Sequence, residues 1–252
     1  MASTFEYSYA FARFYDIIYH QIRDSVDHDY FLNVINDTKG NVLEIGVGTG
    51  RFFTSALTAG ADIYGIDISK SMIDVLRKKL DPKEHYRLTI GDATTMKLNK
   101  KFNLILAPFR VFSHIMDVDD QIKFLNNVWS HLKNDGKFIF DLFIPNPVLL
   151  HNGMHDVVDF EGEYEPGKKL RRTVTSVPDI VNQILDITMN IEWEEDNKWH
   201  NDVWNFKMRF YFRYELQHLI KLSKLKLLQI YGDYNKNALT KDSKEFVIIC
   251  SK

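Results

Sequence analysis

Three glycines crowd into residues 46–50, in the sequence GVGTG that follows the branched aliphatic run VLEI. Glycine costs backbone entropy, so a cluster of glycines indicates positive φ angles or a backbone that approaches another molecule closely. The flanking residues predict a buried strand before the glycines and a helix after them. Such a turn presents free backbone N–H groups to a ligand at a helix N-terminus. A tight turn without a ligand is the alternative.

Two classes of cofactor bind at turns of this kind, dinucleotides and S-adenosylmethionine (SAM). The dinucleotide fingerprint is G-x-G-x-x-G, whose third glycine permits close packing of the helix on the strand. Here the pattern is G-x-G-x-G, and the bulky Arg51 occupies the sixth position, which disfavours NAD. Asp67 ends the next predicted strand, where a carboxylate can accept hydrogen bonds from both ribose hydroxyls of either cofactor.

Two further carboxylates are expected at the same edge of the sheet. Asp92 follows a third predicted strand in the sequence GDA, where its carboxylate or a backbone amide can meet the adenine amino group. Glu44 directly precedes the glycines, and a charge inside a strand is unusual unless it bonds to the turn. Each of these residues alone could be a simple turn cap, but the joint pattern favours SAM.

The elements that must position these residues alternate along the chain from Asn41. Strands are predicted in NVLEIGV, DIYGIDI, YRLTIGDA, FNLILAPF and KFIFDLF, with helices between them, the last of which ends at Gly136. This alternation predicts a parallel sheet with helices on both faces. An aromatic helical arm precedes it, and a helix in YELQHLIKLSK and two strands in LKLLQIYGDY and EFVIIC close the chain.

Between about residues 155 and 214 the pattern alternates with a period of two. Five apolar side chains of the last stretch share one face: Trp204, Phe206, Met208, Phe210 and Phe212. The pattern predicts an antiparallel sheet of four strands with turns at EPGK, PD and EDNK. We therefore expect one α/β domain from residues 1–150 and 215–252, with residues 1–36 as its arm, and a β insertion from residues 151–214.

Five segments, in order and at the right spacing, resemble the motifs of class I SAM-dependent methyltransferases. They are VLEIGVGTGRF, YGIDISKSMIDVLRKK, LTIGDATTM, FNLILAPFRVFSHI and LKNDGKFIFDLF. The resemblance implies a Rossmann-like, mostly parallel sheet of seven strands with a reversed last hairpin. It also implies that SAM lies across the carboxyl ends of the first strands and leaves as S-adenosylhomocysteine (SAH).

The resemblance assigns the cofactor-binding residues by position. They are Tyr15, Gly46, Gly48 and Gly50 at the methionine part, Glu44 beside the turn, Asp67 at the ribose, Ile68, Met72, Asp92 and Ala93 around the adenine, and Ala107 and Phe109 beside the sulfur. The arm and the insertion are similar to those of small-molecule methyltransferases, among them bacterial N,N-dimethyltransferases of nucleotide-linked amino sugars. This implies a small-molecule acceptor, an amine or else a hydroxyl or carboxylate.

The segment RVFSHI, after the fourth strand, supplies Arg110, Ser113 and His114 near the expected methyl donor. His114 titrates nearest neutrality and is the candidate general base. A loop histidine that bonds to the backbone is the alternative. We expect Arg110 and Ser113 to contact the acceptor.

Arg209 and Arg213, with Lys207, are expected on one face of the last insertion strand. There they could bind a phosphate or carboxylate of the acceptor. A solvated face, paired across the strands with glutamates, is the alternative. The apolar face of the insertion must be buried, so we expect the insertion to cover the acceptor site as a lid; a dimerisation surface is the competing interpretation.

Composition narrows the functional classes. The net charge of −2 disfavours nucleic-acid binding, which usually requires a basic stripe. The single Cys250 excludes an intrachain disulfide or a cysteine metal site. Asp141 with Asn146 is a thin acidic cluster, so no metal is expected. The sequence has no pattern of a signal peptide or a membrane span, which favours a cytoplasmic protein, monomeric or homodimeric.

The motif LAPF has a single proline and no polar residue before it. It thus lacks the NPPY pattern of enzymes that methylate DNA adenine or protein glutamine. Three alternative functions stay open after the small-molecule methyltransferase. They are an RNA or protein methyltransferase, an NAD-dependent oxidoreductase, and a regulator that binds SAM without turning it over.

Overall fold

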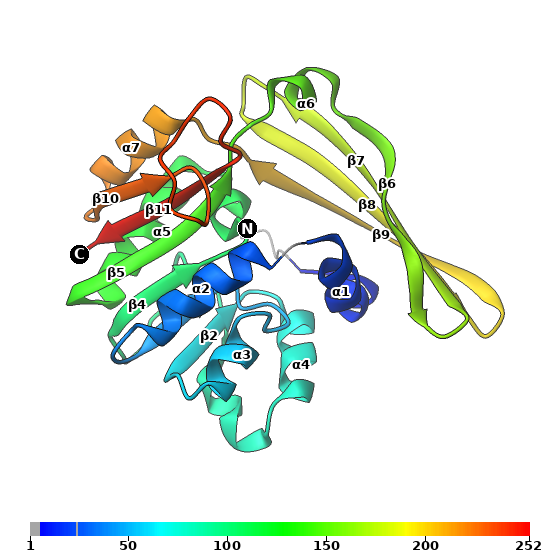
Figure 1. Cartoon of the computed structure of the whole chain (residues 1–252), viewed down its shortest axis with the longest axis horizontal. Coiled ribbons are helices and arrows are strands. Elements are labelled where there is room, and N and C mark those ends of the chain that lie inside the picture. Colours follow the sequence, from blue (N-terminus) through cyan, green and yellow to red (C-terminus); the bar gives the residue numbers. More distant parts are fainter. Residues whose placement is uncertain (1–5, 24) are drawn as a thin grey trace.

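In the computed structural model, which describes residues 6–23 and 25–252, a larger sheet lies between helices and a smaller sheet extends to one side of it (Figure 1). The larger sheet has seven strands in the order β10-β11-β5-β4-β1-β2-β3. They are β1 (Val42–Ile45), β2 (Ile63–Asp67), β3 (Leu88–Ile90), β4 (Phe102–Ala107), β5 (Leu132–Phe143), β10 (Lys226–Tyr231) and β11 (Glu245–Ser251). Strands β1 to β5 pair in parallel, whereas β11 runs antiparallel to β5 and β10. The predicted Rossmann-like sheet with a reversed last hairpin is confirmed.

Helices cover both faces of this sheet, because its strands send alternate side chains to opposite sides. Leu43 and Ile105 belong to the core that includes residues of α5 and α7, while Val42 and Leu104 belong to the core that includes residues of α2, α3 and α4. The helices are α1 (Tyr9–Ile22), α2 (Val26–Asn36), α3 (Phe53–Thr58), α4 (Lys70–Lys79), α5 (Val118–His131), α6 (Pro147–Asn152) and α7 (Arg213–Leu222), with short 3₁₀ helices η1 (Pro82–Arg87) and η2 (Val111–His114). Within the described residues, no helix is long and apolar enough to span a membrane.

The smaller sheet follows β5 through α6 and confirms the predicted antiparallel insertion. Its strands pair in the order of the chain: β6 (Met154–Glu165), β7 (Lys168–Asp179), β8 (Ile184–Glu195) and β9 (Lys198–Arg209). Figure 1 shows this sheet arching beside α1. A third hydrophobic core joins α1 to the smaller sheet, since Phe11 and Phe14 of α1 cluster with Leu170, Ile191 and Trp204 of the sheet.

Two predicted boundaries are wrong. The helix expected to reach Gly136 ends at His131, because Leu132 is buried, takes up an extended conformation and pairs with Phe102 of β4. The last insertion strand ends at Arg209 instead of continuing to Arg213. There the chain turns into α7, whose first residue is Arg213.

Candidate active site

A cavity of about 1260 Å³ lies between the carboxyl ends of the parallel strands, α1 and the smaller sheet. Pockets for one small ligand usually measure about 300–1,000 Å³. The cavity therefore has room for two molecules side by side. The turn after β1 and the ends of β2 and β3 line one half, and the loop after β4 and strands β7 to β9 line the other.

Each glycine of the turn after β1 has a positive φ angle, but Gly48 serves a different purpose from the other two. A Cβ atom on Gly46 would lie 2.3 Å from Val111, and one on Gly50 would lie 2.3 Å from Leu76. A Cβ atom on Gly48 would meet only the Gly46 carbonyl oxygen, at 3.9 Å. Gly46 and Gly50 are thus required by packing inside the protein, while Gly48 leaves bare backbone at the cavity wall.

Asp67 ties the glycine turn to the end of β2. Its carboxylate accepts a hydrogen bond from the backbone N–H of Gly48 and another from that of Ser69, each at 2.8 Å. The side chain is buried yet lines the cavity, and burial raises its pKa to about 6 although both hydrogen bonds oppose the shift. At pH 7 the fold thus holds a charged acceptor at the cavity wall, where a ribose is expected.

Glu44 is a buried acid beside this carboxylate. Burial, with a further effect from the charge of Asp67, raises its pKa well above the ordinary value. Its Oε2 atom has no hydrogen-bond partner among the described residues, so the expected bond to the turn is not made there. Such an orphaned acceptor in a cavity wall fits a ligand that brings an N–H donor, as the ammonium group of SAM does.

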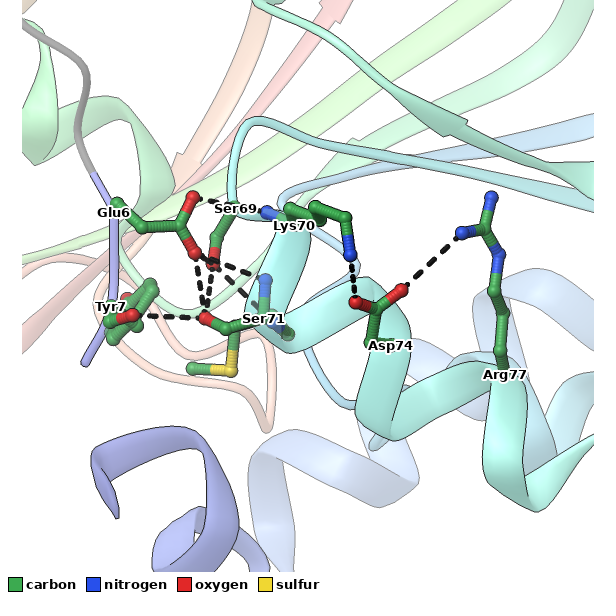
Figure 2. Close-up of polar contacts among 8 residues, drawn as sticks. Glu6, Tyr7, Ser69, Lys70, Ser71, Asp74 and Arg77 are labelled. Atoms are coloured by element: carbon green, nitrogen blue, oxygen red, sulfur yellow. Dashed lines mark hydrogen bonds and ion pairs between the residues drawn. The ribbon is translucent and has the colours of Figure 1, made fainter. Parts of the chain in front are cut away.

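The segment before α1 is fastened to the start of α4 (Figure 2). The carboxylate of Glu6 accepts hydrogen bonds from Ser69 Oγ at 2.8 Å, from the backbone N–H of Lys70 at 3.1 Å and from that of Ser71 at 3.0 Å. A carboxylate is favoured at a helix N-terminus, where N–H groups are unpaired. These hydrogen bonds, with those from the Ser71 hydroxyl, lower the pKa of Glu6 although burial opposes the shift.

This fastening places Tyr7 in the cavity wall, where the arm meets the insertion. The Tyr7 ring centroid lies 4.3 Å from that of Trp204 and 5.3 Å from that of Phe11. Trp204 stacks in turn on Phe206, at 3.9 Å. The arm and the smaller sheet therefore form one continuous aromatic wall of the cavity.

The loop after β4 carries an unusual backbone. Phe109 and Arg110 have φ angles of 61° and 65°, a region that costs a residue with a Cβ atom about 1–3 kcal/mol. The Phe109 ring is held edge-on by Tyr19, at 5.3 Å, and Arg110 pairs with Glu245 at 2.9 Å. Such strain clusters at functional sites, and here it lies where the methyl group is expected.

His114 lies at the end of η2, which follows this loop, and lines the cavity. Burial lowers its pKa to about 4, although a hydrogen bond with the backbone of Lys207 opposes the shift. Its ring lies 5.8 Å from that of Phe206. The imidazole is therefore neutral at pH 7, and it is a weaker base than an exposed histidine.

Most of the residues singled out from the sequence meet at this cavity. Those that line it are Tyr15, Glu44, Gly46, Gly48, Asp67, Ile68, Met72, Asp92, Ala93, Phe109, Arg110 and His114. Gly50, Ala107 and Ser113 are buried and do not line it.

Arg209 and Arg213 do not line the cavity. Arg209 donates to the carbonyl oxygen of Met116 at 3.1 Å and pairs with Glu215 at 3.7 Å, so it ties the segment before α5 to α7. The prediction that Arg213 shares its strand face is wrong, because Arg213 is exposed at the start of α7.

Sequence reasoning missed a buried ion pair in the wall. Arg172 is 1% exposed and donates to Asp159 through Nε at 2.9 Å and Nη2 at 2.7 Å. The sequence alternation could have revealed it, since Arg172 is in phase with the buried Leu170 and Val174 of β7.

No three His, Cys, Asp or Glu side chains gather as metal ligands within residues 6–23 and 25–252.

Residues 42–136 match the family model described as a methyltransferase domain. These residues hold most of the five motifs that resemble class I methyltransferases, and the seven-stranded sheet has the strand order that the resemblance implied. The cofactor of that class is SAM. A methyltransferase of Bacillus mycoides, described as uncharacterised, is 34% identical over 113 residues, or 44% of this chain and 51% of the relative. The chain thus spans about half the length of the curated relatives it matches.

Solved structures resemble nearly the whole chain. A SAM-dependent methyltransferase from Clostridium acetobutylicum has a TM-score of 0.77 at 20% identity, over 96% of this chain and 97% of its own. The sugar N-methyltransferase KedS8 from a Streptoalloteichus species has a TM-score of 0.75 at 13% identity, over 100% and 98%. The amino pentose methyltransferase CalS10 from Micromonospora echinaspora has a TM-score of 0.68 at 14% identity, over 93% and 95%. At these identities the likeness shows the fold, with its insertion.

Proposed function

We propose that the protein transfers a methyl group from SAM to an amine of a small-molecule acceptor, with amino sugars as the model acceptor. The observation that carries the proposal is the two-part cavity under a methyltransferase fold. One half has carboxylates and bare glycine backbone, and the other has an aromatic and apolar wall. The sugar N-methyltransferase and the amino pentose methyltransferase among the solved neighbours support an amino-sugar acceptor.

The first half suits SAM group by group. Gly48 leaves space for the methionine part, and the unpaired oxygen of Glu44 suits its ammonium group. Asp67 offers a charged acceptor to the ribose hydroxyls. Ile68 and Asp92 line the part of the wall where the adenine would lie. Each assignment rests on a hydrogen-bond acceptor or an open space that the cavity wall presents to the ligand.

When bound, SAM supplies a methyl group on a positively charged sulfur; the nucleophile attacks the methyl carbon in line with the carbon–sulfur bond, and the sulfur leaves as part of SAH. The protein has to hold the acceptor in line with that methyl group and to exclude water. Good alignment is worth up to roughly 7–11 kcal/mol of the barrier. Phe109 and Tyr15 flank the expected methyl position, and the wall from Tyr7 to Trp204 closes the cavity on the arm side.

The protonation state of His114 favours an amine over a hydroxyl. A neutral amine attacks with its own lone pair, and the surplus proton of the methylated ammonium leaves to water after the transfer. His114 is neutral at pH 7 and lines the acceptor half, so in our proposal it accepts a hydrogen bond from an N–H of the neutral amine and turns the lone pair toward the methyl group. A hydroxyl would need a much stronger base, which a histidine with a pKa of about 4 does not provide.

We also propose that residues 151–214 act as the lid of the acceptor site, on a catalytic domain made of residues 1–150 and 215–252. Support comes from the apolar face of the smaller sheet, which packs on the arm and lines the cavity. Replacing residues 155–205 with a short Gly/Ser loop should leave SAM binding within about tenfold and abolish turnover. A shortened protein that turns from a dimer into a fully active monomer, by light scattering, would contradict the lid.

SAH release by the purified protein tests the proposed activity. The panel should contain amino sugars, alkyl amines, phenols, sugar hydroxyls and carboxylates, each with SAM. We expect SAH release above background with amines only. Release with phenols or carboxylates and with none of the amines would contradict the proposal, and release dependent on RNA or a protein substrate would favour the alternative function.

A further inference from the structure

The acceptor half of the cavity has an unusually adaptable apolar wall. The chain has 7 methionines, and four of them, Met116, Met154, Met189 and Met208, line this half together with Leu185 and Phe206. Methionine is unbranched and polarisable, so methionine-rich walls accept apolar groups of varied shape. A sugar covered with hydroxyl groups would leave most of this wall without a matching surface.

The wall offers no surplus of positive charge for a nucleotide diphosphate. Eight Asp or Glu and six Arg or Lys residues line the cavity among the residues described. Of the arginines in the acceptor half, Arg172 is already paired with Asp159, and Arg110 with Glu245, which leaves one nitrogen of each, Arg172 Nη1 and Arg110 Nε, without a hydrogen-bond partner in the described part of the chain. A diphosphate placed here would meet single N–H groups of guanidinium ions whose charge is already paired, and not the free two-pronged face that usually binds phosphate.

The lysines of this half do not change that balance. Lys207 and Lys244 line the cavity with exposed side chains, where water and salt screen their charge. Lys207 also pairs with Asp186, at 3.3 Å. This half therefore has little free positive charge to hold an anion, whereas Asp117 and Asp120 also line it and can accept hydrogen bonds from an amine.

We propose that the natural acceptor is an amphipathic amine, in which the methylated nitrogen is attached to a sizeable apolar body and not to a nucleotide. The amine reaches the wall near Phe109 and His114, and the apolar body lies against the methionines of β8 and β9. This inference rests on the proposed function, because it takes this half of the cavity as the acceptor site. It replaces the nucleotide-linked amino sugar with an amine on an apolar carrier as the substrate class.

Binding to the SAH-saturated protein tests the inference without requiring turnover. The probes are ethylamine, 4-phenylbutylamine, 4-phenylbutyrate and thymidine diphosphate, measured by calorimetry. We expect 4-phenylbutylamine to bind at least a hundredfold more tightly than ethylamine and at least tenfold more tightly than 4-phenylbutyrate. Thymidine diphosphate binding more tightly than the phenylbutylamine, or equal affinities for the two phenyl probes, would overturn the inference.

Variants on neighbouring positions of β8 locate the effect. Met189→Gln keeps the length of the side chain and places an amide on the apolar wall, so phenylbutylamine affinity should fall at least fivefold. Thr188→Gln, on the opposite face of the same strand and outside the cavity lining, is the matched control and should change nothing. Equal affinities in both variants, with intact SAH binding and thermal stability, would contradict the placement. Failure of every amine as a methyl acceptor would instead contradict the proposed function and leave this binding order untouched.

Discussion

Asp67→Asn should separate cofactor binding from stability, because the two respond to the Asp67 charge in opposite directions. The pKa of the carboxyl rises from 3.8 to about 6 in the folded protein. At 1.36 kcal/mol per unit, holding the charge at pH 7 costs the fold about 3 kcal/mol. That cost is fully present above pH 6 and disappears as the pH falls toward 3.8.

Asparagine removes this cost but can accept only one of the two hydrogen bonds from Gly48 and Ser69. The lost bond is worth about 1–3 kcal/mol. The free energy of unfolding at pH 7 should therefore stay equal or rise slightly. Cofactor affinity should fall, because two bonds from the ribose lose their charge assistance, about 1–1.5 kcal/mol each, which corresponds to about 30- to 150-fold.

Calorimetry with SAM and thermal unfolding measure the two quantities separately. Asp74→Asn is the matched control, since Asp74 pairs with Lys70 and Arg77 on α4 (Figure 2) and does not line the cavity. SAM affinity within threefold of the unmodified protein would refute the ribose role of Asp67. A fall in affinity accompanied by a clear loss of stability would refute the reasoning from burial.

Three further outcomes are expected. Gly48→Ala should lower SAM affinity at least tenfold by calorimetry, whereas Gly60→Ala, at a position that also has a positive φ angle and open space around it, should lower stability alone. Similar SAM affinities of the two variants would argue against bare backbone at the ligand. SAM affinity should fall about tenfold per pH unit below pH 6, as Asp67 becomes protonated, and this pH dependence should vanish in Asp67→Asn. The same pH dependence in the variant would show that another group is titrating. Glu6→Ala should speed SAM dissociation three- to tenfold in a competition assay, because Tyr7 loses its anchor to α4, and an unchanged rate would show that the arm does not cover the cofactor.

The sequence predicts the cofactor half well, because its determinants are local. A strand, a glycine turn and a helix lie within a few consecutive residues, and Asp67 follows at a fixed spacing. The period of two between residues 155 and 214 likewise predicts the smaller sheet, since each strand alternates between a buried and an exposed face. Such patterns require no knowledge of distant contacts.

The way in which the arm and the smaller sheet enclose the cavity depends on contacts between distant residues, which no local pattern encodes. Glu6 meets Ser69 across 63 positions, and Arg13 meets Glu195 across 182. The end of β9 at Arg209 is likewise set by packing, because the apolar alternation itself runs on to Phe212. The sequence therefore could not show that Arg209 ends the strand and that Arg213 begins a helix.

Cofactor choice is the most direct test of the account. We expect SAM and SAH to bind the purified protein with micromolar dissociation constants and NAD to show no binding in the same calorimeter. At a concentration one hundred times its dissociation constant, either ligand should add about 2.7 kcal/mol to the free energy of unfolding and raise the melting temperature visibly. Binding of NAD, with no heat and no melting shift from SAM or SAH, would contradict the account.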